Sequence, residues 1–382
     1  MAAPQAQSPT MAPSDITGTL AAFRRNIDND ARRRQAPTRL PIRYDDDDYL
    51  LRFLRVAKYD LTKASERLFN LEAWEDEHLG SDHHPMTAVR FLDVLGSGML
   101  TPLPAPGPLG HTVLFSDYSK FNFNAFRKEH IVQALYYLFE QLLQRRGAQL
   151  AGTGVAVIAD ATNFGWSDLT SEVQHDVIRF LQDRLPVRVG TIALCHHSAV
   201  MSMVWGIVRP FVNAKLRERV QLVGSKGDGL ETFFGPTQIP ASLGGTLDPK
   251  GVSEDFNLLR EFVDEETEEI ELSGAVGPGD FGVEGMTVGP FTFARDVISN
   301  TPAHQIGIQQ FDIILTVNGK PVTSAGNLVV TPDVTHLSCR VKRTVQDVWN
   351  RKLTDLAAAQ AERLKQLSLE TSRNNNSAPQ ES

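Results

Sequence analysis

Residues 185–225 read LPVRVGTIALCHHSAVMSMVWGIVRPFVNAKLRERVQLVGS. A strand is expected over 188–195, because the residues there are largely β-branched or apolar. Apolar residues then dominate up to Val212, and the segment that follows is basic, although the chain as a whole has a formal net charge of -8. Pro210 interrupts the helical pattern. By itself the pattern predicts a core helix, then a solvated helix, and a second strand over 219–223.

On the N-terminal side of this stretch, strand-like and helix-like segments alternate. Such alternation is typical of an α/β unit, in which helices cover a largely parallel or mixed sheet. Still earlier, between about residues 16 and 78, apolar residues recur at helical spacing and predict a small helical bundle. The alternating segments are a strand at 111–118, a helix at 124–145, a strand at 154–160 and a helix at 168–185.

The character of the chain changes after LGGTLD at 243–248. An acidic segment comes next, followed by short β-like runs and turns, among them an Asn-Gly pair at 318–319 that is typical of a hairpin. A helical pattern and a polar tail end the chain. We therefore predict a disordered tail (1–17), a helical module (18–90), an α/β domain (91–250), an acidic helix or linker (251–282), a small β-rich domain (283–343) and a C-terminal helix with a disordered tail (344–382).

Charge, hydropathy and cysteine content narrow the class of protein. A negative net charge argues against general nucleic-acid binding, for which a basic excess is usual. The sequence has neither the long apolar run of a membrane span nor the pattern of a secretory leader. Its two cysteines, Cys195 and Cys339, form no disulfide framework. We expect a cytoplasmic protein that meets membranes only transiently.

A search of the sequence for catalytic and metal-binding motifs gives little support to the hypothesis that the protein is an enzyme. Asp45–Asp48 could be taken for a metal site, but acidic residues are also favoured in the first turn of a helix. His83-His84 and Cys195-His196-His197 lack the spaced ligand pairs of zinc motifs, so we interpret them as loop or core residues. We find neither a phosphate-binding glycine loop nor a nucleophile motif, and we assign no catalytic residue, no metal and no cofactor.

Three stretches together carry a family resemblance. DDDDYLLRFLRVAKYDLTKASERL (45–68), the quoted 185–225 and LETFFGPTQIPASLGGTL (230–247) occur in this order. They resemble the CRAL-TRIO lipid-binding family, of the tocopherol, retinaldehyde and phosphatidylinositol transfer type, over about residues 16–248. The resemblance implies an N-terminal helical bundle and an α/β domain whose sheet is the floor of an apolar pocket under a mobile gate helix.

By position, the gate would be residues 200–212. The sequence departs from the family at CHHSAV, where Ile-Asn-x-Pro is usual, and at DATNFGW. These departures leave open whether the ligand is a phosphoinositide or another hydrophobic small molecule. The resemblance places the pocket and gate residues at Phe115, Phe121, Phe123, Leu135, Phe139, Ile158, Phe164, Ile192, Leu194, Val200, Met203, Val204, Trp205, Ile207, Val208, Phe211 and Val212.

Basic residues beside the gate have a second implied role. Arg188, Lys215 and Arg219 match positions that contact phosphoinositide phosphates in the tocopherol and retinaldehyde branch of the family. Arg209 and Arg217 belong to the same basic cluster. A carrier of this kind opens its pocket against the bilayer, so an apolar gate and a basic cluster belong side by side where the protein meets the membrane.

The C-terminal unit carries a second resemblance. SNTPAHQIGIQQFDIILTVNGKPV (299–322) is similar to the central motif of PDZ domains, which implies a PDZ-like fold and a protein partner. Phe311 stands where that family usually has Gly. The short spacing between Val322 and the last strand leaves little room for the helix that lines a PDZ peptide groove. A purely structural β domain is the alternative.

Two hypotheses of function follow. In the first, the protein binds a lipid and exchanges or presents it at phosphoinositide-containing membranes. In the second, it is a membrane-recruited scaffold in which the PDZ-like unit binds a protein partner and the lipid module acts as a sensor. An enzyme ranks third, because no catalytic group can be assigned.

Overall fold

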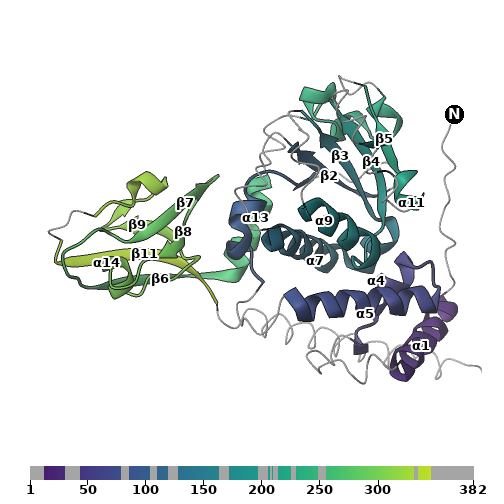
Figure 1. The fold of residues 1–382 in the computed structure, drawn as a ribbon, viewed down its shortest axis with the longest axis horizontal. Coiled ribbons are helices and arrows are strands. Elements are labelled where there is room, and N and C mark those ends of the chain that lie inside the picture. The colour runs from purple at the N-terminus through teal and green to yellow at the C-terminus, as the bar shows by residue number, and fades with distance from the viewer. Residues whose placement is uncertain are drawn as a thin grey trace, which may run out of the picture.

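The protein contains two β-sheets that lie on either side of helix α13 (Asp255–Glu266) in the computed structural model (Figure 1). The helical N-terminal elements lie beneath the first sheet, and the second sheet is at the far end of the molecule. The structure describes residues 13–30, 44–78, 86–103, 110–118, 128–162, 172–196, 205–206, 209, 214–224, 229–247, 255–330 and 334–345.

Three helices form the predicted N-terminal module: α1 (Pro13–Asn29), α4 (Asp47–Val56) and α5 (Leu61–His78). The expected apolar stripes are confirmed, since Leu50, Phe53, Leu54, Leu68 and Leu71 are buried. Helix α1 begins five residues inside the segment that we predicted as a disordered tail (1–17).

The acidic run at the start of α4 caps this helix. Asp46 is the N-cap, and its carboxylate accepts a 2.8 Å hydrogen bond from the main-chain N–H of Asp48. Asp47 lies in the first turn, where a negative charge is favoured by the helix dipole, and forms an ion pair with Arg24. The interpretation of these residues as a helix start is confirmed.

The first sheet has the strand order β1-β2-β3-β4-β5. Strands β2 to β5 are parallel, and the two-residue β1 pairs antiparallel with β2. The predicted alternation of strands and helices is confirmed, although α7 continues eight residues beyond its predicted end at 145. The elements are β1 (Thr101–Pro102), β2 (Thr112–Asp117), α7 (Lys128–Thr153), β3 (Val155–Asp160), α9 (Glu172–Asp183), β4 (Val189–Cys195), α11 (Ala214–Arg217) and β5 (Val220–Leu222).

The sequential order of β2 to β5 determines which face the helices cover. Parallel neighbours are joined by right-handed crossovers, so successive connections in one direction fall on the same side of the sheet. Leu114 and Val155 pack on this helix-covered face, in the large core that includes α7. Their neighbours Val113 and Ala156 point the other way, as the period of two in a strand requires.

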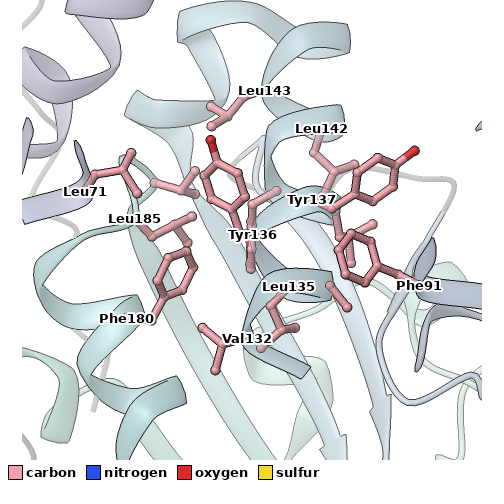
Figure 2. Packing of buried hydrophobic residues seen from close by; sticks show 14 of the residues in the cluster. Leu71, Phe91, Val132, Leu135, Tyr136, Tyr137, Leu142, Leu143, Phe180 and Leu185 are labelled. Carbon is pink, nitrogen blue, oxygen red and sulfur yellow. The ribbon is translucent and has the colours of Figure 1, made fainter. Parts of the chain in front are cut away.

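Helix α7 is buried along most of its length. Every residue from Ile131 to Leu143 is buried, which is expected of a helix enclosed on all sides rather than one on a protein surface. Figure 2 shows Tyr136 on the side of Phe180, and the two rings are 6.2 Å apart. Tyr137 points to the other side, toward Phe91 at 5.8 Å.

The opposite face of the first sheet is covered by residues 229–247. Three turns of 3-10 helix in this stretch, η4 (Leu230–Thr232), η5 (Pro236–Gln238) and η6 (Ala241–Leu243), bring Leu230, Phe234, Ile239 and Leu243 onto the sheet. Gly245 needs its lack of a side chain, because a Cβ atom there would lie 1.9 Å from the carbonyl oxygen of Ile239.

The second sheet is antiparallel and has the order β6-β11-β9-β8-β7, with β10 paired to β9. Residues 267–275 lie inside the predicted acidic helix or linker, and this part of the prediction was wrong. They form strand β6, in which outward acidic residues alternate with Ile270 and Leu272, which pack on the core. The elements are β6 (Thr267–Ala275), β7 (Val283–Val288), β8 (Phe291–Val297), α14 (Pro302–Gln305), β9 (Ile313–Val317), β10 (Lys320–Pro321), η7 (Ala325–Asn327) and β11 (His336–Thr344).

Two details of this unit match its sequence. Asn318 and Gly319 both have positive φ, 46° and 74°, as a type I′ hairpin turn requires, so the predicted turn is confirmed. Phe311, which stands where PDZ domains usually have Gly, has φ 71° and therefore occupies the left-handed region that favours glycine.

The segment after β10 packs directly on the edge strand β7. Between β10 and β11, the described residues contain one turn of 3-10 helix, η7, in agreement with the short spacing in the sequence. A Cβ atom on Gly285 would lie 2.2 Å from the Leu328 side chain, and the N–H of Ala325 donates a 2.6 Å hydrogen bond to Thr287 Oγ1. Leu328 and Ala325 thus pack on β7.

The two sheets share one hydrophobic core. Val288, Phe291, Phe293 and Ile313 of the second unit belong to the same buried cluster as α7 and the N-terminal helices. The approach is closest at Gly96, which follows the short helix α6 (Leu92–Leu95), where a Cβ atom would lie 2.2 Å from Val288 Cγ1.

A buried carboxylate lies at the junction of the two units. Glu266, the last residue of α13, is 1% exposed. Its side chain accepts hydrogen bonds from the N–H of Ala88 at 2.6 Å, the Tyr137 hydroxyl at 2.9 Å and the Gln141 amide at 3.4 Å. Burial, followed by the charge of Glu266, raises the pKa of Tyr137 well above its usual value, so this phenol remains a donor.

We expect Glu266→Ala to lower the free energy of unfolding by about 2 to 3 kcal/mol, because it leaves the N–H of Ala88 and the Tyr137 hydroxyl buried without their acceptor. Urea unfolding followed by fluorescence measures this change. Glu268→Ala, at an exposed position in β6, is the matched control and should change the value by less than about 0.5 kcal/mol. Equal effects of the two variants would contradict the role of Glu266.

Candidate functional site

Most of the predicted gate lies outside the described residues. Within 200–212, the structure describes Trp205 and Gly206, which are helical, and Arg209, which is exposed. Trp205 is half-buried and packs against the large core. The predicted pocket and gate residues that lie outside the description are Phe121, Phe123, Phe164, Val200, Met203, Val204, Ile207, Val208, Phe211 and Val212.

The predicted pocket residues that are described divide between the two faces of the first sheet. Phe115 and Ile158 point away from the helices into the cluster beneath residues 229–247, so they do not lie on the helix-covered face. Leu135 and Phe139 are buried within the packing of α7. These four side chains therefore do not form one wall, because a strand sends alternate side chains to opposite faces and the sequence alone did not show which face was which.

Ile192 and Leu194 differ from these four because they are half-buried. Ile192 packs against the large core on the helix-covered face, and Leu194, two residues on, points to the same side. The alternate residues of β4, Ala193 and Cys195, are 0% exposed on the other face. Parallel sheets are usually buried on both faces, so the incomplete cover over β4 is a specific feature of this sheet.

Other apolar side chains share this partial burial. Val157 of β3, Val177 and Leu181 of α9, and Trp205 are all half-buried and all pack against the same core. Sequence reasoning missed Val157, Val177 and Leu181. The signals were the alternation along β3 and the four-residue spacing on α9, both of which also fit ordinary core positions. We call Val157, Val177, Leu181, Ile192, Leu194 and Trp205 the half-buried apolar set.

A polar pair closes the carboxyl ends of β3 and β4. His196 Nδ1 lies 3.0 Å from Asp160 Oδ1, which also accepts hydrogen bonds from the N–H and hydroxyl of Thr162 at 3.0 and 2.6 Å. Burial acts to raise the pKa of Asp160, but the hydrogen bonds from Thr162 and His196 outweigh it and leave the pKa below its usual value. His196 was predicted to be a loop or core residue, and the structure places it at a strand end with a carboxylate partner.

Cys195, next to this pair, is unsuited to act as a nucleophile. Its side chain is buried, and burial, followed by the charge of Asp160, raises the pKa of its thiol to about 12. The reactive form of cysteine is the thiolate, which such a thiol does not supply near neutral pH. The position His197 lies outside the described residues.

Basic side chains gather at the opposite, amino-terminal edge of the sheet. Arg188 directly precedes β4, Arg219 directly precedes β5, and His111 directly precedes β2. Because parallel strands begin at the same edge, the fold brings these three residues together. We call them the amino-edge basic cluster.

Main-chain carbonyl groups hold the two arginines of this cluster. Arg188 donates to the carbonyl oxygens of Arg55 at 2.8 Å and Gly152 at 3.4 Å, and Arg219 donates to that of Val189. Burial, followed by repulsion from Arg219, lowers the pKa of Arg188. Burial also lowers the pKa of Arg219, and the charge of Glu218 partly offsets this effect.

The structure therefore brings two of the predicted phosphate-contacting residues, Arg188 and Arg219, into one cluster. Arg217, the last residue of α11, is half-buried and lies two residues before Arg219 in the chain. Of Lys215, only the main chain is described. Sequence reasoning missed His111. The signal was its place before β2, at the edge where β4 and β5 also begin.

No helix in the described part of the chain combines the length and the apolar character that crossing a membrane requires.

Comparison with known proteins gives the first sheet a family context. Residues 97–245 match the family model of the CRAL/TRIO domain. The C-terminal sheet is an antiparallel β unit outside the matched residues.

Several curated proteins are similar to this part of the chain. A mouse protein named alpha-tocopherol transfer protein-like is 29% identical over 208 residues, which are 53% of this chain and 59% of that protein. The human protein of the same name is 27% identical over the same shares of the two chains, and rat clavesin-2 is 25% identical over 53% of this chain and 63% of its own. The chain thus spans about three fifths of the length of the curated relatives it matches.

Among solved structures, the crystal structure of Sfh5 aligns with a TM-score of 0.46 and 12% sequence identity, covering 68% of this chain and 100% of that one.

We expect Asp160→Asn to lower stability by about 1 kcal/mol near neutral pH, through weaker hydrogen bonds to Thr162 and His196. The pKa of Asp160 is lower in the folded than in the unfolded chain, so its stabilising effect is present above 3.8, the usual value, and is lost as the pH falls through the folded value. The difference between parent and variant in urea unfolding should therefore shrink in acid. A difference that grows in acid would contradict this assignment; Asp176→Asn, exposed on α9, is the control.

Proposed function

We propose that the CRAL/TRIO domain binds an apolar lipid and exchanges or presents it at phosphoinositide-containing membranes. The half-buried apolar set is the observation that carries this proposal. It places apolar side chains from β3, β4, α9 and the segment after β4 around the same core without covering them completely. The names of the tocopherol transfer protein-like relatives support a lipid ligand of this kind.

The ligand belongs on the helix-covered face of the sheet. The other face is filled by residues 229–247, and Ile158 there is 0% exposed. On the helix-covered face, Ile192 and Leu194 retain exposed surface that a hydrocarbon chain would cover. Trp205, in the connection between β4 and β5, packs against the core on this same face, the side that a right-handed crossover favours. That connection includes Trp205 and the proposed gate, residues 200–212.

The energetics of a lipid ligand explain why such a site has to open against a membrane. A hydrocarbon chain of about sixteen carbons costs on the order of 13 kcal/mol to expose to water, at roughly 0.8 kcal/mol per methylene. Transfer through water is therefore slow. Opening against a bilayer lets the chain pass from one apolar medium to another, and the apolar gate then inserts into the interfacial layer.

The amino-edge basic cluster supplies the second contact with the membrane. The connection between β4 and β5 starts at the carboxyl edge of the sheet and ends at its amino edge, so its basic end, α11, lies beside Arg188 and Arg219. Each basic residue near an anionic surface contributes about 1 kcal/mol to attraction. The acidic remainder of the chain disfavours adhesion through other surfaces.

A scaffold role through the C-terminal unit is the second candidate. The six strands and the hairpin turn of this unit fit a PDZ-like β domain. A partner strand added at β7 would, however, have to displace Leu328 and Ala325, which cover that strand. We therefore rank the scaffold role below lipid binding and transfer. Lipid binding and transfer require no catalytic residue.

Native mass spectrometry of the full chain, purified from cells, should detect a co-purified lipid. Ile192→Asn should lower lipid occupancy several-fold, because it places an unpaired amide against the ligand. Ile298→Asn is the matched control, since Ile298 directly follows β8 and is 59% exposed, and the lipid occupancy of this variant should equal that of the parent. A parent protein that stays empty after incubation with cellular lipid extracts would disprove lipid binding.

Arg219→Gln should reduce binding to vesicles that contain phosphatidylinositol bisphosphate about fivefold, as expected for the loss of about 1 kcal/mol. Arg219→Lys should keep most of the affinity, which separates the effect of charge from that of the hydrogen bond to Val189. Vesicle sedimentation measures both variants. Arg260→Gln, exposed on α13, is the control and should bind like the parent; equal loss in the control would show that only net charge matters.

A further inference from the structure

The position of His111 connects it to the proposed phosphoinositide contact. It precedes β2, yet its ring reaches over the start of β4, two strands away in the sheet. A Cβ atom on Gly190 would lie 3.2 Å from His111 Nε2 and 3.3 Å from Cδ2. The absence of a side chain at Gly190 therefore makes the space in which the imidazole lies.

An irregularity in the sheet contributes to this arrangement. The register between β3 and β4 shifts between Val155 and Val157, directly beside Gly190. The carbonyl oxygen of Val155 would be 3.1 Å from a Cβ atom on Gly190. Gly190 thus leaves room for the imidazole at the edge where main-chain carbonyls hold Arg188 and Arg219.

The charges around His111 come from several elements. Arg219, before β5, acts on it directly and, after burial, is the second cause that lowers the pKa of His111. Arg219 also repels the positive charge of Arg188, which precedes β4, and so lowers the pKa of Arg188. The negative charge of Glu218 acts to raise the pKa of Arg219. Tyr59, which follows α4, acts to raise the pKa of Arg188. The imidazole of the free protein is therefore mostly neutral near pH 7, beside two permanent positive charges.

We propose that His111 is the third cationic group of this site and that it takes up a proton when a phosphate-rich headgroup binds at Arg188 and Arg219. This inference rests on the proposed membrane contact and adds its regulation. A bound polyanion offsets the repulsion from Arg219 and stabilises the imidazolium. By linkage, a proton that binds with the headgroup makes headgroup affinity rise as the pH falls.

The direction of the effect depends on which group is titrated. Phosphate monoesters lose part of their charge near pH 6, which weakens their binding in acid. Protonation of His111 strengthens binding over the same range. The difference between the parent and a variant without the imidazole therefore isolates the contribution of His111.

The test compares the full-length parent with His111→Gln by calorimetric titration with soluble inositol trisphosphate and by sedimentation with vesicles containing phosphatidylinositol bisphosphate. We expect the two proteins to bind alike at about pH 8, and the parent to bind about fivefold more tightly at about pH 6. Titrations in two buffers of different ionisation enthalpy should show more protons taken up on binding by the parent than by the variant.

A second variant tests the charge of residue 111 by a gain of binding, which a loss of folding could not produce. His111→Lys carries a permanent charge, so it should bind more tightly than His111→Gln at about pH 8 as well as at about pH 6, with no added proton uptake. Thermal unfolding of each variant checks that its fold is intact. Vesicles with phosphatidylserine in place of the phosphoinositide show whether a general negative surface is enough.

Each outcome separates the two proposals. Identical pH profiles for parent and His111→Gln, with binding retained, would overturn the role of His111 and leave the membrane contact standing. No binding by the parent at any pH would overturn the membrane contact itself. An equal pH difference on phosphatidylserine vesicles, without one for soluble inositol trisphosphate, would also overturn the headgroup site, because it would reflect only surface charge.

Discussion

The burial of helix α7 from Ile131 to Leu143 is the constraint on which the rest of this structure depends. A helix without a solvent-facing side from Ile131 to Leu143 needs an apolar partner in every direction. The first sheet, helices α4 and α9 and the second unit supply these partners, and each is therefore held to the others through α7. Glu266 accepts hydrogen bonds from the N–H of Ala88 and the hydroxyl of Tyr137, two polar groups that this packing removes from water.

Periodicity in the sequence predicted most of the first sheet and the N-terminal helices, because apolar residues such as Leu50 and Leu68 recur at the spacing their helices require. It failed at β6, where acidic side chains hide the alternation of Ile270 and Leu272. It also gave no sign of the shared core. Val288 and Phe293 have the pattern of ordinary strand residues, and nothing local shows that their partners come from more than a hundred residues earlier in the chain.

The candidate site was only partly predictable for a related reason. Family resemblance located Ile192, Leu194, Arg188 and Arg219 by position in the sequence, and the fold groups them. Resemblance could not show which face of the sheet Phe115 occupies. Side chains of a strand alternate between the two faces, and which of them face the helices depends on packing with segments far away in the chain. His111 escaped notice because its proximity to β4 depends on a register shift and on the missing side chain at Gly190.

The contact of Gly96 with Val288 has a consequence for how such a chain changes over evolutionary time. The boundary of the CRAL/TRIO match at residue 245 lies inside a common core rather than at a gap between separate bodies. Recombination at that boundary would strip apolar cover from α7 and leave it exposed. The two halves therefore share apolar surface, and a larger side chain at Gly96 or Val288 requires the other half to repack.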